Sequence, residues 1–193
     1  MPTLYHSPQT RSDTVVDLVR MLGADVDIHE VTIRRQDGSG VQDPANPHPE
    51  KKVPYLVDGE DHVRERGAIM LYLTDTYPQA KLGPLPGEAG RGAYLSWLAY
   101  YQGVMEPLLI LQWAGIENPV VTDGLGDMER MLETLAAALR DGPWLLGERF
   151  SAADMLLSSP FQWFGDALPA GPEVRDWVDR CAKEVAAATG AMA

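Results

Sequence analysis

The chain has 193 residues, of which 45% are hydrophobic and 23% are charged, and its formal net charge at pH 7 is −12. This length suits one large or two small domains, and the composition is ordinary for a globular protein. Acidic residues occur throughout the chain and no basic stripe is visible, so we expect neither a nucleic-acid partner nor an anionic membrane surface.

The cysteine and histidine content narrows the chemistry further. Cys181 is the single cysteine, which excludes a disulfide within the chain and disfavours a thiol-ligated metal site. His6, His29, His48 and His62 lack metal-ligand spacing, so we expect each to be structural or solvent-exposed, and no metal to bind. The sequence has no signal-peptide pattern and no apolar run long enough to span a membrane. We therefore expect a cytoplasmic protein.

The N-terminal part of the chain predicts a strand, a helix and a second strand. Residues 2–6 and 26–33 have the character of strands, and residues 12–22 between them carry apolar side chains at helical spacing. This order of elements forms a parallel pair of strands with a right-handed crossover.

A long polar loop, a hairpin and a second helix are predicted next. Residues 34–50 are rich in Pro, Gly, Asp and Asn, and loops of this length are often functional. Short strands at 53–57 and 61–64 flank an Asp-Gly turn, which is a strong hairpin signal. The helix predicted over 65–76 is apolar on all sides within 68–73. It therefore needs cover on more than one side, from its own sheet and from a second domain or a partner subunit.

The rest of the chain is predicted to be helical. A Pro- and Gly-rich linker at 79–87 separates a domain at 1–78 from a domain at 88–193. The predicted helices span residues 94–112, with a kink at Pro107, and residues 128–139, 151–167 and 172–188.

Three motifs follow one another within this pattern. Val53-Pro54-Tyr55-Leu56 begins a predicted strand, Glu65-Arg66-Gly67-Ala68-Ile69 opens the second helix, and Phe150–Met155 contains a Ser-x-x-Asp capping box with a hydrophobic staple. Together with the order of elements, they resemble the glutathione transferase superfamily over nearly the whole chain. The resemblance implies an α/β thioredoxin-like N-terminal domain (βαβ-ββα with a cis-proline) followed by an all-helical bundle.

The resemblance implies that the Val53–Pro54 peptide bond is cis and that the Val53 backbone pairs with the cysteinyl part of glutathione, like one rung of a sheet. A trans proline at the start of an edge strand is the structural alternative. Among the nearby basic residues, Lys52, Arg34 or Arg35 could reach the glycine carboxylate of glutathione, although a solvated role is the alternative for each.

The matching family segment at the second helix uses a glutamate and a serine to bind the γ-glutamyl end of glutathione. Glu65 matches the glutamate, whereas Arg66 occupies the serine position. Arg66 could hold a carboxylate bidentately or point into solvent. The alternative for Glu65 is an acidic residue that stabilises the first helical turn by about 0.3–1 kcal/mol.

The implied chemistry is the activation of a thiol, because only the thiolate attacks electrophiles. A hydroxyl that donates to sulfur at the start of a helix would favour the thiolate. The family places this group in the segment that ends at Ser12, which contains no cysteine, so mixed-disulfide chemistry is disfavoured. The candidates, in order, are Thr10, Ser12, Arg11 and Tyr5. Ser12 could instead be a helix N-cap and Thr10 a plain turn residue.

The resemblance implies a homodimer and a glutathione transferase whose co-substrates are glutathione and a small hydrophobic electrophile. A glutathione-dependent reductase, peroxidase or isomerase, and a non-catalytic binding or regulatory protein, are the alternatives. The predicted pocket for the second substrate contains Tyr100, Tyr101, Met105 and Trp113, with core packing as the alternative for at least two of them. Cys181 is expected to be buried packing.

Overall fold

The computed structural model describes residues 1–190, without the side chain of Asp166. The chain divides after Ala80 into two compact units, a division that falls inside the predicted linker at 79–87. Within the described residues, none of the helices combines the length and the apolar character that crossing a membrane requires.

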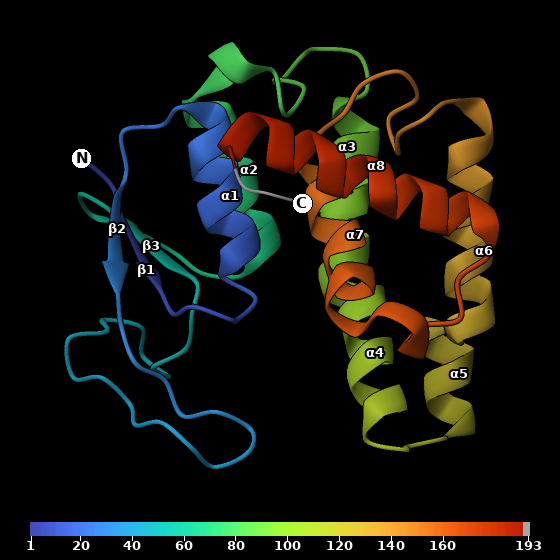
Figure 1. The fold of residues 1–193 in the computed structure, drawn as a ribbon, viewed down its shortest axis with the longest axis horizontal. Helices are drawn as coiled ribbons and strands as arrows, with labels where there is room; N and C mark the ends of the chain where they lie inside the picture. Colours follow the sequence, from blue (N-terminus) through green and yellow to red (C-terminus); the bar gives the residue numbers. More distant parts are fainter. Residues whose placement is uncertain (191–193) are drawn as a thin grey trace. The chain divides into compact units, whose positions relative to one another are not determined.

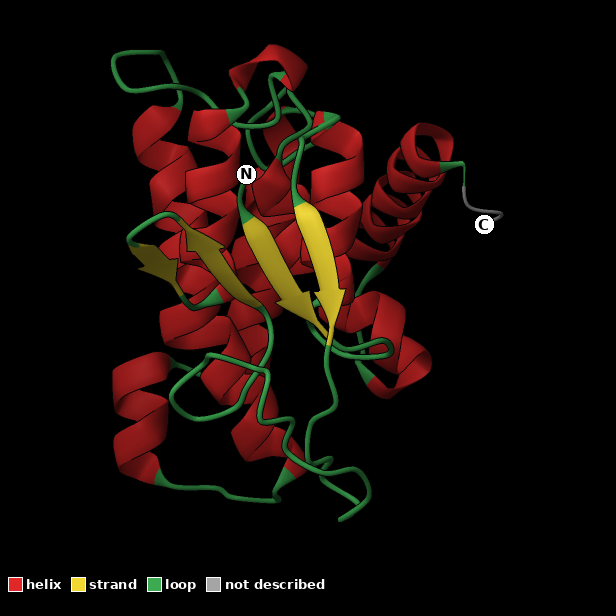
Figure 2. Ribbon diagram, turned by 90° about the vertical axis from the view of Figure 1, so that its left-hand side faces the viewer, coloured by secondary structure: helices red, strands yellow, loops and turns green. Residues whose placement is uncertain are grey.

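The first unit is a four-stranded mixed sheet with two helices on one of its faces (Figures 1 and 2). The strand order is β2-β1-β3-β4, in which β1 pairs parallel with β2 and antiparallel with β3, and β3 pairs antiparallel with β4. Its elements are β1 (Thr3–His6), α1 (Asp13–Leu22), β2 (Asp27–Glu30), β3 (Tyr55–Asp58), β4 (Asp61–Val63), α2 (Arg66–Thr76) and a 3₁₀ turn (Pro78–Ala80).

The two central strands, β1 and β3, and the apolar stripe of α1 build the core of this unit. Leu4 of β1 and Leu56 of β3 are fully buried, and so are Val15 and Leu18 of α1. Gly23 ends α1 in the left-handed conformation with a φ of 58°, which glycine adopts without the penalty that a Cβ imposes. The predicted strand–helix–strand opening is therefore confirmed.

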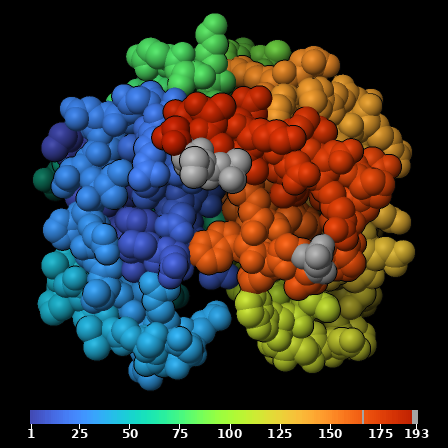
Figure 3. Space-filling model, viewed as in Figure 1, coloured from blue at the N-terminus to red at the C-terminus, as the bar shows by residue number. Residues whose placement is uncertain are grey.

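The second strand is shorter than predicted. β2 ends at Glu30 rather than near residue 33, and all four of its residues are exposed at the edge of the sheet. Residues 31–54 then form an irregular loop without a helical turn, whose light blue to cyan surface lies at the lower edge of the first unit in Figure 3. Within it, the Val53–Pro54 peptide bond is cis, as predicted.

The apolar helix α2 is covered less completely than its composition predicts. Ile69, Met70 and Leu73 are fully buried, whereas Ala68 is exposed and Leu71 is half-buried. One face of α2 therefore belongs to the core of the first unit, and its other side carries apolar groups that solvent reaches.

The second unit is helical, as predicted. Its helices are α3 (Arg91–Tyr100), a π-helical segment (Tyr101–Met105), α4 (Glu106–Trp113), α5 (Pro119–Leu125), α6 (Met128–Ala138), α7 (Ala152–Phe164) and α8 (Pro172–Thr189), with 3₁₀ turns at Leu139–Asp141 and Gly165–Ala167. The helix continues from α3 through the π-helical segment into α4, and Pro107, which has no N–H to donate to the preceding turn, comes just after that segment. α5 was not predicted.

Asp154 anchors the core of the second unit. Its carboxylate is fully buried and accepts hydrogen bonds from the Ser151 N–H and hydroxyl, from the Leu145 N–H and from the Trp177 indole, all at 2.9–3.0 Å. The predicted capping box is thus present, and it also ties α7 to α8 and to the segment before α7. Cys181 is buried, as predicted.

Candidate functional site

The turn between β1 and α1 contains a chain of side-chain hydrogen bonds that runs from His6 through Ser12 to Thr10. The Thr10 and Ser12 hydroxyl oxygens lie 2.6 Å apart, and the Ser12 hydroxyl lies 2.8 Å from Nδ1 of His6. Both hydroxyls also contact the Ser7 carbonyl oxygen, at 2.7 Å from Thr10 and 3.1 Å from Ser12. Two predicted candidates therefore share one network with a histidine that the sequence did not single out.

Ser12 occupies the N-cap position of α1, but its hydroxyl makes no capping bond to the helix. It is fully buried and accepts instead from the Ser7 N–H at 3.2 Å. The N-cap alternative is therefore wrong for the side chain. A buried hydroxyl with these neighbours cannot contact a substrate directly, so any role of Ser12 acts through another group.

Thr10, by contrast, is half-buried and stands where the turn enters α1. Its hydroxyl accepts from the Ser12 N–H at 3.1 Å, while the Asp13 carboxylate accepts from the Thr10 N–H at 3.2 Å. This reciprocal pair works like a capping box. Thr10 is thus more than a plain turn residue, and its hydroxyl is the outer end of the hydrogen-bonded chain.

The electrostatics of the turn depend on His6 and Asp13. Nδ1 of His6 lies 3.8 Å from the Asp13 carboxylate. Burial lowers the pKa of His6 below its ordinary value, against the opposing pull of Asp13, and burial raises the pKa of Asp13. His6 is therefore mainly uncharged at neutral pH, and it can accept a proton beside a carboxylate that stabilises the charged form.

Two arginines near the turn behave differently. The Arg11 side chain is exposed. Arg35, in the loop after β2, is half-buried and donates to the carbonyls of Pro8 and Gln9, at 2.9 and 3.3 Å. Gln9 has a φ of 58°, in the left-handed region that non-glycine residues rarely adopt. Arg35 therefore stabilises an unusual stretch of backbone immediately before Thr10.

The strand register brings the first two sequence motifs to the same end of the sheet as this turn. Tyr5 is opposite Tyr55, so the end of β1 lies beside the start of β3 and the Val53–Pro54 peptide. Leu56 is opposite Val63, so the end of β4, which leads into Glu65, lies at this end of the sheet too. Tyr5 itself is half-buried, and its ring contacts the ring of the exposed His29.

The segment before Pro54 is held by its own side chains. Asn46 is fully buried, donates to the Lys52 carbonyl at 3.1 Å and accepts from the His48 N–H at 3.0 Å. The Lys52 side chain is exposed and forms an ion pair with Glu50. Among the described residues, the backbone N–H and C=O of Val53 have no hydrogen-bond partner. Val53 therefore offers the donor and acceptor that an extended peptide needs.

The start of α2 carries a strained residue and a buried cation. Glu65 is exposed, with a φ of 69° and a ψ of 126°, and a conformation of this kind costs about 1–3 kcal/mol. Arg66 is only 5% exposed, so the alternative in which it points into solvent is wrong. The first N–H groups of an α-helix lack intrahelical acceptors and suit an anion.

The residues predicted for a second-substrate pocket are not equivalent. Tyr101 and Met105 are fully buried in the core of the second unit, whereas Tyr100 is half-buried and Trp113 is 67% exposed. Trp113 packs edge-on against Phe164 with ring centroids 4.6 Å apart. Tyr100 and Trp113 are therefore the two that can offer surface to a small molecule.

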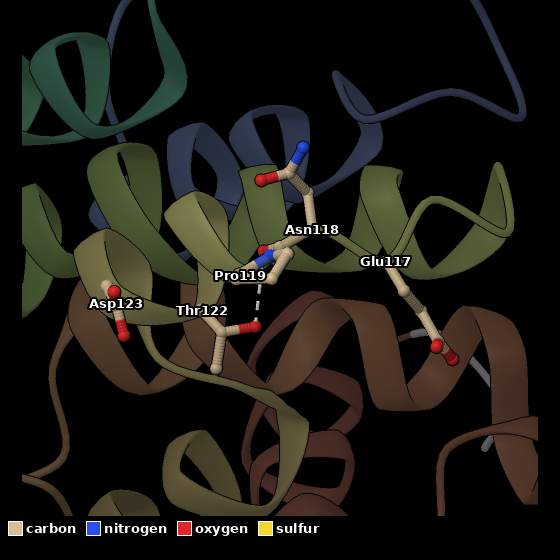
Figure 4. Close-up of a pocket in the computed structure, with 5 residues that line it drawn as sticks. All are labelled: Glu117, Asn118, Pro119, Thr122 and Asp123. Atoms are coloured by element: carbon tan, nitrogen blue, oxygen red, sulfur yellow. Dashed lines mark hydrogen bonds between the residues drawn. The ribbon is translucent and has the colours of Figure 1, made fainter.

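Two surface pockets of the second unit contain none of the predicted site residues. Figure 4 shows a shallow one at the start of α5, where Glu117, Asn118, Pro119, Thr122 and Asp123 form the walls. Its two carboxylates make it unsuitable for an anionic peptide. A second pocket lies between α6 and the start of α8. No group of three or more metal-binding side chains occurs among the residues that the structure describes.

Comparisons with known proteins agree with the fold. Residues 118–180 match the family model "Glutathione S-transferase, C-terminal domain". The chain is 26% identical over 165 residues to "Glutathione S-transferase GstA" of Escherichia coli O157:H7, covering 83% of this chain and 81% of that protein.

Solved structures give the same result over the full length. A glutathione transferase from Methylococcus capsulatus has a TM-score of 0.74 and 25% identity and covers 100% of both chains. A sphingomonad glutathione S-transferase complexed with glutathione has a TM-score of 0.72 and 25% identity, covering 98% of this chain and 96% of that one.

Proposed function

We propose that this chain, whose fold and relatives support the glutathione transferase superfamily, is an enzyme that activates the glutathione thiol for attack on a small hydrophobic electrophile. One observation carries the proposal. The strand register brings the end of β1, the Val53–Pro54 peptide and the segment leading into Glu65 together at one end of the sheet. Each of these segments has a chemical feature that suits one part of the tripeptide.

The middle of glutathione would pair with Val53. Its free backbone N–H and C=O form one rung with the cysteinyl residue, and this pairing fixes the direction of the peptide without using a side chain. The γ-glutamyl end would lie at the start of α2, where the helix N–H groups and Arg66 attract its carboxylate. The exposed Glu65 carboxylate then pairs with the ammonium group.

The glycine end would reach Lys52. This side chain already pairs with the Glu50 carboxylate at the surface, so it can exchange that partner for the carboxylate of the peptide. An exposed pair of this kind contributes little, about 0–1 kcal/mol, and the backbone and the start of α2 provide most of the specificity.

The thiol would face Thr10. With the cysteinyl backbone at Val53, the side chain points toward the end of β1 and the turn that follows it. Thr10 presents a half-buried hydroxyl at the start of α1, where a hydrogen bond and the helix dipole both favour a thiolate. Tyr100 and Trp113 of the second unit are the candidate apolar contacts for the electrophile.

A glutathione-binding protein without transferase activity is the second candidate. In the structure, the Thr10 and Ser12 hydroxyls are already engaged with each other and with the Ser7 carbonyl. If this arrangement stays unchanged after glutathione binds, neither hydroxyl has a proton to donate to sulfur. Reductase, peroxidase or isomerase activity would use the same glutathione site. The first two oxidise glutathione and the third returns it unchanged, so none of them leaves a stable conjugate.

Calorimetric titration with glutathione tests the binding step. We expect saturable binding, a loss of at least tenfold in affinity for Glu65→Gln, and little change for Glu60→Gln, which removes an exposed glutamate in the β3–β4 turn. An assay that measures the glutathione conjugate formed from an activated aryl chloride then distinguishes a transferase from a binding protein. Absence of glutathione binding would contradict every glutathione-dependent function.

The proposed assembly is a homodimer. The apolar groups at Ala68 and Leu71, which solvent reaches in the single chain, fit a contact with a second copy. Sedimentation equilibrium measures the mass directly. A mass equal to that of one chain at micromolar concentration would contradict the dimer.

A further inference from the structure

Building on the proposed function, we propose that His6 accepts the proton of the glutathione thiol, which reaches it through the hydroxyls of Thr10 and Ser12. The three groups form a relay that begins at the half-buried Thr10, passes through the fully buried Ser12 and ends at Nδ1 of His6. The relay gives the thiol a proton acceptor that the substrate does not have to touch.

The distances within the relay are those of short hydrogen bonds. The two hydroxyl oxygens are 2.6 Å apart and the Ser12 oxygen is 2.8 Å from Nδ1 of His6. Oxygen atoms at the first distance must have a proton between them. Each hydroxyl has one proton and two lone pairs, so the chain can order its protons in two directions.

In the first direction, Thr10 donates to Ser12 and Ser12 donates to Nδ1 of a neutral His6. The Thr10 oxygen is then an acceptor toward the substrate. In the second direction, His6 donates from Nδ1 to Ser12, Ser12 donates to Thr10, and the Thr10 hydroxyl is a donor. The Ser7 carbonyl can accept this last proton when no substrate is present.

Activation of the thiol converts the first direction into the second. The S–H proton moves to the Thr10 oxygen, the Thr10 proton moves to Ser12, and the Ser12 proton moves to Nδ1 of His6. One S–H bond breaks and one N–H bond forms, and no electrons are transferred. Afterwards the Thr10 hydroxyl donates to the thiolate sulfur. In this scheme Ser12 acts through Thr10, which is the hydroxyl that contacts the substrate.

The surroundings of His6 suit both of its charge states. The charged side chains that act on it are Asp13, Asp17 and Arg20 from α1 and Glu30 from β2. Burial disfavours the cation, so His6 is neutral and able to accept. Once it is charged, Asp13 at 3.8 Å and Glu30 stabilise the imidazolium, and Arg20 is the single opposing charge among these four. The His6 side chain retains 12% exposure, through which the proton can pass to water after the electrophile has reacted.

Nitrogen-detected NMR of the imidazole ring is the direct test. We expect His6 to be neutral in the free protein near neutral pH, to become an imidazolium when glutathione binds, and to stay neutral with S-methylglutathione, which has no thiol proton. The His6→Asn variant assigns the signal, and His29→Asn, which removes an exposed histidine of the neighbouring strand, leaves the response unchanged. Glutathione binding with thiolate formation but no protonation of His6 would overturn the relay, whereas absence of binding would overturn the proposed function as well.

The pH profile of conjugation distinguishes a relay from a merely structural role. Asparagine can still hydrogen bond with Ser12 but does not titrate, so glutathione affinity should stay within a few-fold in His6→Asn. We expect kcat/KM to fall at least tenfold near about pH 6.5, and the difference to narrow above about pH 8.5, where free thiol ionises without help. A uniform loss at every pH, or no loss, would overturn the proposal.

Discussion

The Arg35 side chain donates a 2.9 Å hydrogen bond to the backbone carbonyl of Pro8, a residue 27 positions earlier in the chain. A second bond from the same guanidinium reaches the Gln9 carbonyl at 3.3 Å. The loop after β2 thus holds the turn that leads into α1, and it does so at the residue whose φ is positive. The loop after β2 thereby stabilises the backbone immediately before Thr10, the residue proposed to activate the thiol.

Arg35→Gln should impair the site more than the fold. The variant loses the two-pronged contact, which an arginine makes and a shorter amide does not, so the Pro8–Gln9 backbone becomes mobile and Thr10 is less well placed. We expect kcat/KM for conjugation to fall about three- to tenfold. The free energy of unfolding should change by less than about 1 kcal/mol, because the contact is partly solvated.

Arg34→Gln is the matched control, because Arg34 directly precedes Arg35 in the same loop and its side chain is exposed. Steady-state kinetics and urea unfolding of both variants are the measurements. Equal activity of the two variants would show that the Arg35 contact has no part in positioning the turn.

Thr10→Val tests the hydroxyl at the outer end of the relay. Valine keeps the shape of threonine but has no oxygen, so the thiolate loses its donor, and losses of about 10²–10³ in rate accompany the removal of such a donor in other enzymes. The variant also loses an interaction of the capping type, worth about 1 kcal/mol. Thr10→Ser retains the hydroxyl and should stay within about tenfold of the wild type. Comparable rates for the valine and serine variants would contradict the role of the hydroxyl.

Stability below neutral pH should report the burial of His6. Burial lowers the pKa of His6 in the folded protein below the value of about 6.5 that it has when unfolded. As the pH falls below about 6.5, the unfolded chain therefore takes up a proton before the folded one, and the free energy of unfolding decreases until the folded pKa is passed. His48 shifts in the same direction, so the wild type must be compared with His6→Asn. We expect the difference between them to change with pH only below about 6.5, in urea unfolding at a series of pH values. A constant difference would contradict the lowered pKa.

Asp154→Ala should destabilise the second unit strongly. The Trp177 indole N–H and the Leu145 N–H would lose their buried acceptor, at about 1–3 kcal/mol for each unsatisfied group, and the capping box at Ser151 would be lost. We expect a loss of about 3 kcal/mol or more in thermal unfolding monitored by tryptophan fluorescence. Asp179→Ala, at an exposed position on α8, should change stability by less than about 0.5 kcal/mol. A loss of that small size in Asp154→Ala would show that the box is dispensable.

Much of the fold could be predicted because local patterns and long-range packing agree. Three local patterns each predicted an element that the structure contains: the apolar stripe of α1, the Asp-Gly hairpin and the Ser151–Asp154 box. α5 was missed because its helical segment is short and includes Pro119 and Gly124, while its stabilising cap, the Asn118 side chain on the Val120 N–H, is a single polar contact.

The site was less predictable for a different reason. Thr10 and Ser12 could be named from their place before a helix, but the chain they form with His6 depends on the positive φ of Gln9 and on Arg35, which lies in a separate loop. A histidine at the end of a strand carries no local signal of such a contact. The burial of Arg66 likewise depends on how α2 packs, which its sequence does not reveal.

The most direct measurement is a crystal structure with glutathione bound. We predict the sulfur within hydrogen-bonding distance of the Thr10 hydroxyl, the cysteinyl backbone paired with the N–H and C=O of Val53, and the γ-glutamyl carboxylate at the start of α2. Glutathione bound elsewhere, or bound beside Val53 with its sulfur directed away from Thr10, would contradict the proposed site.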